Sequence, residues 1–180
     1  MHKKIPSIFT FISEFKKEQI LKFDENIGII FRNYKDKFNK NQIIEIKQFC
    51  RLNNRKFYLA NNLKLAVNLN LDGAYIPSFN KNLGLKKYNL RKNFLILGSA
   101  HNVCEIKIKQ EQGVEVLFLS PLFKTKNYKQ GLDVVKFNIL CSFFNKKIIA
   151  LGGINKKNIN KLKITNAHGY SGISYFSNRL

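Results

Sequence analysis

The chain has 180 residues, of which 44% are hydrophobic, and it carries a formal net charge of +21. This length and apolar content predict a single folded domain spanning residues 1–180 and exclude wholesale disorder, while no apolar run approaches the ~20 residues of a membrane-spanning helix. The charge favours anionic, phosphorylated ligands, but 27 Lys and 23 Asn beside only 5 Arg indicate a compositional bias rather than specific nucleic-acid recognition.

Eight short runs rich in Ile, Val, Phe and Leu recur along the chain at fairly even spacing. We interpret the first as a strand and not as a signal peptide, because Glu14 and Lys16 end its apolar stretch. Several runs are apolar almost throughout, which is typical of parallel strands buried on both faces. The predicted strands cover 7–13, 27–33, 56–62, 73–78, 93–99, 114–120, 147–153 and 169–174.

Segments of helical character lie between the predicted strands. The spacing of apolar residues predicts helices over 39–54, 102–113, 131–145 and 155–164. Gly113 is suited to end the second of these helices, and Asn155 is suited to cap the start of the last. The segments after the first and fourth strands predict only short, weak helices.

Eight alternating β/α units without a break in composition predict one compact (β/α)8 barrel with short or missing terminal helices. The length lies below the ~200 residues that are usual at the lower limit of this fold. The alternative is an open, doubly wound sheet. No G-x-G-x-x-G motif follows the first strand and no P-loop is present, which removes the main support for that alternative.

In such a barrel the loops that follow the strands carry the function. Here these loops are polar or rich in small residues, and one of them holds a lone arginine, Arg32, which together predict a site for an anionic ligand. Gly152 and Gly153 end the seventh strand, where barrels commonly bind phosphate through bare backbone N–H groups. The alternative for this glycine pair is a plain left-handed turn between strand and helix.

The three cysteines, Cys50, Cys104 and Cys141, stand far apart, and no two of them have metal-ligand spacing. Their odd number argues against a disulfide framework. We therefore expect reduced thiols and a cytoplasmic protein.

Three segments resemble the thiamine-phosphate synthase family, which includes the thiazole tautomerases of the TenI type. They are "GVEVLFLSPLFKTKNYKQG" (113–131), "IIALGGINKKNI" (148–159) and "HGYSGIS" (168–174). Weaker similarity at 29–35, 57–78 and 96–106 makes the resemblance collinear over nearly the whole chain. The family is a (β/α)8 barrel, and the resemblance implies an enzyme that joins aminopyrimidine diphosphate to thiazole phosphate and releases pyrophosphate.

The resemblance also implies roles for individual residues. Arg32, Asn61 and Ser99 would face the diphosphate, with Thr125 beside the substrates on the loop after the sixth strand. The thiazole phosphate would be bound by Gly152, Gly153, Ile173 and Ser174. His101 would be a proton-transfer group, since imidazole side chains transfer protons near neutral pH; the alternative is a histidine at a helix start that only hydrogen-bonds the backbone.

Some positions depart from the family pattern. The two Asp residues that bind Mg²⁺ in the family are replaced by Asn62 and Asn80, and a Lys is replaced by Tyr34. An amide oxygen can ligate Mg²⁺ but contributes no charge, so Mg²⁺ is expected only if the chain is a synthase. The thiazole-phosphate half of the pattern is better kept than the diphosphate half.

Three functions remain open from the sequence: a synthase, a metal-independent thiazole tautomerase that uses His101, and a non-catalytic binder of thiazole phosphate. In each of them the partners are small phosphorylated molecules. The chain could also form a homo-oligomer, while specific nucleic-acid binding and membrane insertion are not expected.

Overall fold

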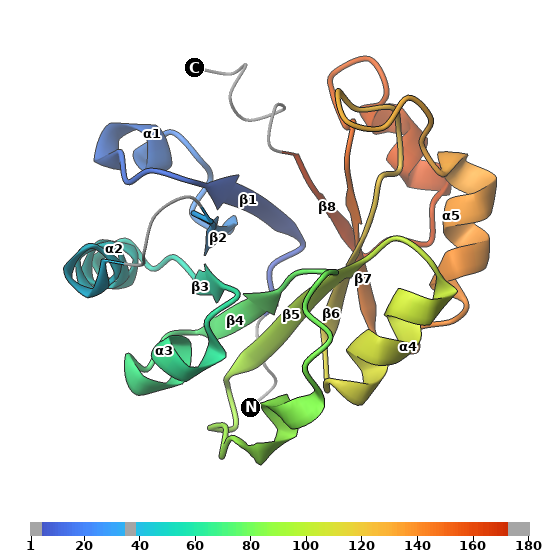
Figure 1. Ribbon diagram of the computed structural model, residues 1–180. Helices are drawn as coiled ribbons and strands as arrows, with labels where there is room; N and C mark the ends of the chain where they lie inside the picture. The colour runs from blue at the N-terminus through green and yellow to red at the C-terminus, as the bar shows by residue number, and fades with distance from the viewer. Residues whose placement is uncertain (1–4, 35–38, 173–180) are drawn as a thin grey trace.

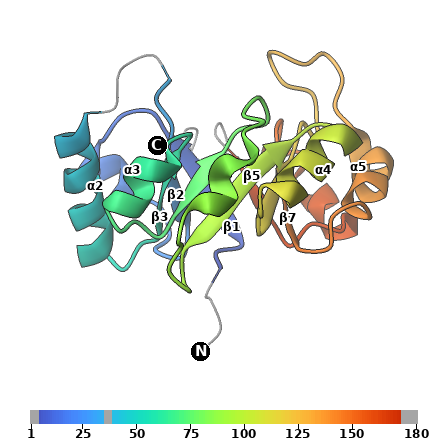
Figure 2. The same cartoon turned by 60° about the horizontal axis from the view of Figure 1, so that its bottom comes forward.

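The computed structural model describes residues 5–34 and 39–172. Its eight strands are parallel, pair in chain order and close into a barrel, because β8 pairs with β1 as well as with β7. The helical segments lie outside this ring, as two views of the chain show (Figures 1 and 2). The predicted (β/α)8 barrel is therefore confirmed, and the open-sheet alternative is wrong.

All eight predicted strands are confirmed, each within a few residues of its expected ends. The strands are β1 (Ile8–Ile12), β2 (Gly28–Phe31), β3 (Phe57–Ala60), β4 (Gly73–Ile76), β5 (Leu95–Ala100), β6 (Val116–Leu119), β7 (Lys147–Leu151) and β8 (Gly169–Ser171). The α-helices are α1 (Lys17–Leu21), α2 (Lys40–Leu52), α3 (Leu63–Asn68), α4 (Val103–Glu111) and α5 (Asp133–Cys141), and the 3₁₀ helices are η1 (Leu83–Lys87) and η2 (Ile159–Ile164).

One local signal at a helix end acts as expected, and a second cap was not predicted. Asn39, which was not singled out from the sequence, caps α2 by accepting hydrogen bonds from the N–H groups of Asn41 and Gln42. Gly113 follows α4 with φ +77°, the left-handed conformation that ends many helices. The helices after β1 and β4 are short, as predicted, whereas α3 was not anticipated.

The helix expected over 155–164 was wrong at its start, because only the 3₁₀ helix η2 forms there, from Ile159. Asparagine side chains hold the preceding residues in turns. The amides of Asn155 and Asn158 both donate to the carbonyl of Gly153, at 3.2 and 2.8 Å. Such side-chain bonds to nearby backbone compete with helix formation. No helix N-terminus therefore follows the glycine pair directly.

Aromatic rings fill the inside of the barrel. Phe118 of β6 packs edge-on against Phe9, with ring centroids 5.0 Å apart, and against Tyr75 at 5.4 Å. Phe11 and Tyr58 belong to the same buried cluster. Because this interior is packed solid, ligands must bind at the ends of the strands.

None of the helices within the described ranges is long and apolar enough to cross a bilayer.

Candidate functional site

Arg32 stands at the barrel mouth directly after β2. Its backbone N–H donates to the carbonyl of Ile12 at 2.8 Å, which continues the β1–β2 pairing by one residue. Its guanidinium carbon lies 4.7 Å from the centre of the Phe11 ring, a cation–π contact that holds the side chain over the packed interior. Within the described residues no carboxylate pairs with it. The guanidinium is therefore positioned by the Phe11 ring at the mouth, and no described carboxylate neutralises its charge.

Ser99 lies at the floor of the mouth, near the end of β5, and is almost fully buried. Its hydroxyl is hydrogen-bonded to the phenol of Tyr75, and burial is the main cause that raises the pKa of Tyr75. Tyr75 was not identified from the sequence, because an aromatic residue in a buried strand predicts only packing. The Tyr75 phenol is neutral at physiological pH. Ser99 and Tyr75 together place two hydroxyl groups at the bottom of the mouth.

Asn61, Asn62 and Asn80 lie on the β3–β4 side of the mouth, where Asn61 and Asn80 are bonded to each other and Asn62 bonds the backbone of α3. The Asn80 amide donates to Oδ1 of Asn61 at 2.8 Å, and Oδ1 of Asn80 accepts from the N–H of Asn82 at 3.0 Å. Oδ1 of Asn62 caps α3 by accepting from the N–H of Leu65 at 3.0 Å. Each of these amide oxygens is already engaged within the protein.

These engagements bear on the Mg²⁺ site that the family implies. Mg²⁺ is usually bound through one or two carboxylates, and the expected positions, Asn62 and Asn80, supply none. In the described part of the chain, no cluster of three or more His, Cys, Asp or Glu residues could hold a metal ion. The residues present do not fit a Mg²⁺ ion, so no chemical step below passes through one.

Lys109 and Gln112, at the end of α4, bind backbone carbonyls of the loop that contains Asn80. The fully buried ammonium of Lys109 donates to the carbonyls of Pro77 and Asn80 and to Oε1 of Gln112, each at 2.8 Å. Burial lowers the pKa of Lys109 to about 8. This lysine was not identified from the sequence, although it lies three residues after the buried Ile106, on the same face of the helix.

His101 follows β5 and is held by contacts of its ring and of its backbone. Its Nδ1 lies 2.8 Å from the carbonyl oxygen of Ser120, which can only accept, and 3.2 Å from the hydroxyl oxygen of the same residue, so Nδ1 carries a proton in the bond to the carbonyl. Its backbone N–H donates to Glu105 at 2.7 Å, and its ring stacks on Tyr128 with centroids 5.9 Å apart. This arrangement suits His101 to accept a proton at Nε2.

The loop between β6 and α5 covers the other side of the mouth. Thr125 closes a turn in it, because its hydroxyl accepts the N–H of Tyr128 at 3.1 Å while its own N–H donates to the Tyr128 carbonyl at 3.0 Å. The N–H of Phe123 donates to the carbonyl of Gly152 at 3.1 Å. The loop is thus attached to the end of β7.

Gly152 and Gly153 have φ of +94° and +71°, so the plain left-handed turn does form here. A Cβ on Gly153 would lie 2.5 Å from the carbonyl oxygen of Lys124, and one on Gly152 would lie 2.8 Å from Cβ of Pro121. Packing of the β6–α5 loop therefore requires both glycines. Among the described residues, no acceptor takes a hydrogen bond from either glycine N–H.

A pocket of ≈ 610 Å³ opens beside this glycine pair. None of its ten described lining residues is acidic, and two of them are lysines. The lining residues are Lys124, Thr125, Lys126, Asn127, Leu151, Gly152, Gly153, Ile154, Asn155 and Gly172. Free amides and lysines around an empty volume favour an anion. Ile173 and Ser174, the other residues expected to bind the phosphate, lie outside the described residues.

Taken together, the fold and the mouth define a (β/α)8 barrel with a candidate site for an anion at the carboxyl ends of its strands. The model of the thiamine monophosphate synthase (TMP-TENI) family matches residues 20–176. The chain belongs to that family, as the resemblance in its sequence indicated.

Relatives with assigned names agree with this membership. The chain is 30% identical over 152 residues to the thiamine-phosphate synthase of Prochlorococcus marinus subsp. pastoris, covering 83% of this chain and 42% of that protein. It is 25% identical over 182 residues to the thiamine-phosphate synthase of Pelagibacter ubique, covering 92% and 86%. The chain thus spans less than half the length of the Prochlorococcus relative.

Among solved structures, the thiamine phosphate pyrophosphorylase from Pyrococcus furiosus is similar, with a TM-score of 0.75 at 17% sequence identity. The match covers 96% of this chain and 87% of that one. At this level of identity the likeness supports the fold.

Proposed function

We propose that the chain joins an aminopyrimidine diphosphate to a thiazole phosphate and releases pyrophosphate. One observation carries the proposal: a single mouth offers two separate positions for phosphate groups. One position is at the amides of Gly152 and Gly153 after β7, and the other is at the Arg32 guanidinium after β2. These strands are three steps apart around the ring, so two phosphorylated substrates can bind together. The names of the relatives support the same reaction.

In this reaction the bond between the pyrimidine methylene carbon and the diphosphate oxygen breaks. Its electron pair leaves with pyrophosphate, and the lone pair of the thiazole nitrogen forms the new carbon–nitrogen bond. The protein must stabilise the negative charge that grows on the leaving group. Arg32 serves that purpose in our proposal, without a divalent cation at Asn62 and Asn80.

A second candidate, a thiazole tautomerase, rests on His101. The Nδ1–H of this side chain donates to the Ser120 carbonyl, so Nε2 is the ring nitrogen that would act as the base. A tautomerase needs only the thiazole phosphate, a proton acceptor and a proton donor, and it needs no diphosphate site. Arg32 has no evident role in that reaction, and we therefore place it second.

A paired assay of the purified full chain separates the candidates. In the first arm, pyrimidine diphosphate and thiazole phosphate are supplied with EDTA or with Mg²⁺, and thiamine phosphate is measured. In the second arm, the unrearranged thiazole tautomer is supplied and its isomerisation is followed. The variants Arg32→Gln and His101→Ala are tested in both arms.

The proposed synthase predicts thiamine phosphate in the first arm and a loss of its formation in Arg32→Gln. Turnover in the second arm alone, abolished by His101→Ala, would instead establish the tautomerase. Binding of thiazole phosphate without turnover in either arm would leave only the non-catalytic binder.

The cytoplasmic location, the possible homo-oligomer and the roles of Ile173 and Ser174 in phosphate binding stay predictions.

A further inference from the structure

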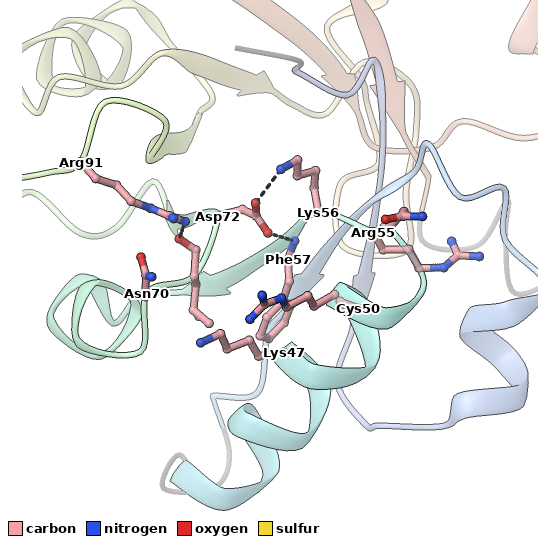
Figure 3. A pocket seen from close by; sticks show the side chains of 11 residues that line it. Lys47, Cys50, Arg55, Lys56, Phe57, Asn70, Asp72 and Arg91 are labelled. Atoms are coloured by element: carbon pink, nitrogen blue, oxygen red, sulfur yellow. Dashed lines mark hydrogen bonds and ion pairs between the residues drawn. The ribbon is translucent and has the colours of Figure 1, made fainter. Parts of the chain in front are cut away.

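A second polar pocket lies at the other end of the barrel, where the strands begin. It has a volume of ≈ 450 Å³ and is bordered by α2, by the start of β3 and by the segments that precede β4 and β5 (Figure 3). Its lining residues are Lys47, Cys50, Arg51, Asn54, Arg55, Lys56, Phe57, Asn70, Leu71, Asp72 and Arg91. None of these residues belongs to the mouth described above.

The pocket is strongly positive. Five of its lining residues are basic and one, Asp72, is acidic. The Asp72 carboxylate is already engaged, because it takes an ion pair from Lys56 at 2.8 Å and a hydrogen bond from the N–H of Phe57 at 3.0 Å. Four positive charges are therefore left without compensation from the lining itself.

The type of cation is also informative. The chain has 5 Arg among its 32 basic residues, so five basic positions would by composition hold about one arginine. This pocket holds three: Arg51, Arg55 and Arg91. A bias toward lysine explains lysines on the surface, but it does not explain this concentration of guanidinium groups. Guanidinium groups bind phosphate through paired donors, which an ammonium group cannot do.

Neutral partners orient two of these arginines. Arg55, which is 6% exposed, donates to the carbonyls of Asp24 and Phe23 at 2.8 and 2.6 Å, and its Nε is buried without a described partner. Arg91 donates to the carbonyl of Leu71. Carbonyl groups fix the positions of the guanidinium groups but do not neutralise their charge. The nearby carboxylate of Asp24 interacts electrostatically with Arg55, but it is bound by Asn26 and does not line the pocket.

The two basic residues on α2 are more open. Lys47 is half-buried and Arg51 is exposed, and no described carboxylate lies within ion-pair distance of either. Figure 3 shows Lys47 and Arg91 reaching the pocket from different elements, with Asn70 between them. An anion placed here would meet charges that converge from separate segments of the chain.

We propose that this pocket binds the phosphate chain of a small oligophosphate, at a site separate from the barrel mouth. Its volume lies in the range of small-molecule sites, and its net charge matches an anion that carries several negative charges. The proposal does not depend on the reaction at the mouth, because the two sites share no residue.

The test is a titration of the full chain with inorganic tripolyphosphate and, in a second arm, with ATP, both without divalent cations. Amide signals in ¹⁵N NMR report the two ends separately, through Asn70 and Asp72 for this pocket and Gly152 and Gly153 for the mouth. The double variant Lys47→Gln/Arg51→Gln removes two charges without removing a hydrogen bond between described residues. The matched control, Lys107→Gln/Lys136→Gln, removes two exposed charges from the outer helices α4 and α5.

We expect saturable shifts at Asn70 and Asp72 whose Kd rises at least about tenfold in the pocket variant and less than about twofold in the control. Equal affinities for tripolyphosphate and ATP would identify the phosphate chain as the recognised part, and tighter ATP binding would add a contact to the nucleoside. An equal loss of affinity in both variants, or shifts confined to the mouth, would overturn the proposal.

Discussion

On the β6–β8 side of the mouth the lining groups include main-chain amides, those of Gly152 and Gly153, beside two lysines. On the β2–β5 side they are side chains: the Arg32 guanidinium and asparagine amides that bond one another. The first side is fixed by packing, because the β6–α5 loop leaves no room for a Cβ. The second side is open to change by single substitutions. In the sequence resemblance the family pattern is kept around the glycines and altered around Asn62 and Asn80.

The largest expected effect comes from the packed side. Gly153→Ala forces a non-glycine residue to φ +71° and brings its Cβ within 2.5 Å of the Lys124 carbonyl oxygen. We expect the free energy of unfolding to fall by about 2 kcal/mol or more, and thiazole-phosphate affinity to fall more than about tenfold. Urea unfolding and calorimetric titration measure the two effects.

Gly113→Ala is the matched control for this variant. It imposes a similar positive φ of +77°, but no atom lies within 4 Å of the added Cβ. Its free energy of unfolding should fall only by the cost of the positive φ, and its affinity for the thiazole phosphate should not change. Equal effects of the two substitutions on ligand affinity would contradict the role of the packed turn.

On the β2–β5 side of the mouth, Arg32→Gln should weaken the binding of pyrimidine diphosphate selectively. Removing a charge-assisted contact to a phosphate group costs about 1.5–3 kcal/mol, so pyrimidine diphosphate should bind roughly tenfold to a hundredfold more weakly. Thiazole-phosphate binding should not change. Arg32→Lys, which keeps the charge but not the paired donors, should recover part of the affinity. If Arg32→Gln weakens both ligands equally, the mouth is not divided in this way.

The buried Lys109 predicts a pH-dependent stability. Its pKa is lowered to about 8 in the folded chain, so the folded state loses this proton at lower pH than the unfolded state does. The cost of burying the charge is fully present below pH 8 and is relieved as the pH rises from 8 toward the ordinary lysine pKa of ~10.4. The free energy of unfolding should therefore gain on the order of 1 kcal/mol across this window.

The comparison for this prediction is Lys109→Met, which lacks the titrating group. The variant should be less stable near neutral pH, because the carbonyls of Pro77 and Asn80 lose their shared donor. Its unfolding free energy should not show the extra rise above pH 8. If urea unfolding gives both proteins the same dependence of stability on pH, Lys109 is not the group that causes the rise above pH 8.

The smallest expected effect concerns Mg²⁺. Synthase activity of the wild-type chain should change less than about twofold between EDTA and Mg²⁺, because Asn62 and Asn80 offer no carboxylate. Asn62→Asp/Asn80→Asp keeps the acceptors for the N–H groups of Leu65 and Asn82, removes the donor to Asn61 and restores two carboxylates. This variant should gain a saturable Mg²⁺ response in both activity and melting temperature. A wild-type chain that already requires Mg²⁺ would show that other groups bind the ion.

Much of the fold was predictable because the strand signals are local. Continuous apolar runs ended by polar or glycine residues identified all eight strands, and Gly113 marked a helix end. The helix predicted over 155–164 was wrong at its start, because its asparagines resemble helix caps but instead bond the Gly153 carbonyl. A local pattern does not tell which of these two bonds the same side chain will make.

The site was predictable in its position but less so in its connections. Strand counting and the family resemblance identified Arg32, Ser99, His101 and the glycine pair as residues of the mouth. They did not reveal that the Ser120 carbonyl fixes the His101 tautomer or that Lys109 supports the Asn80 loop. These contacts join residues 19 and 29 positions apart, and only the closed barrel brings them together.

A crystal structure of the full chain with thiazole phosphate and pyrophosphate tests the divided mouth most directly. We predict the phosphate of the thiazole within hydrogen-bond distance of the N–H groups of Gly152 and Gly153, and pyrophosphate against the Arg32 guanidinium in the same molecule. A structure in which both ligands compete for the glycine pair, or in which the mouth holds neither, would contradict this account.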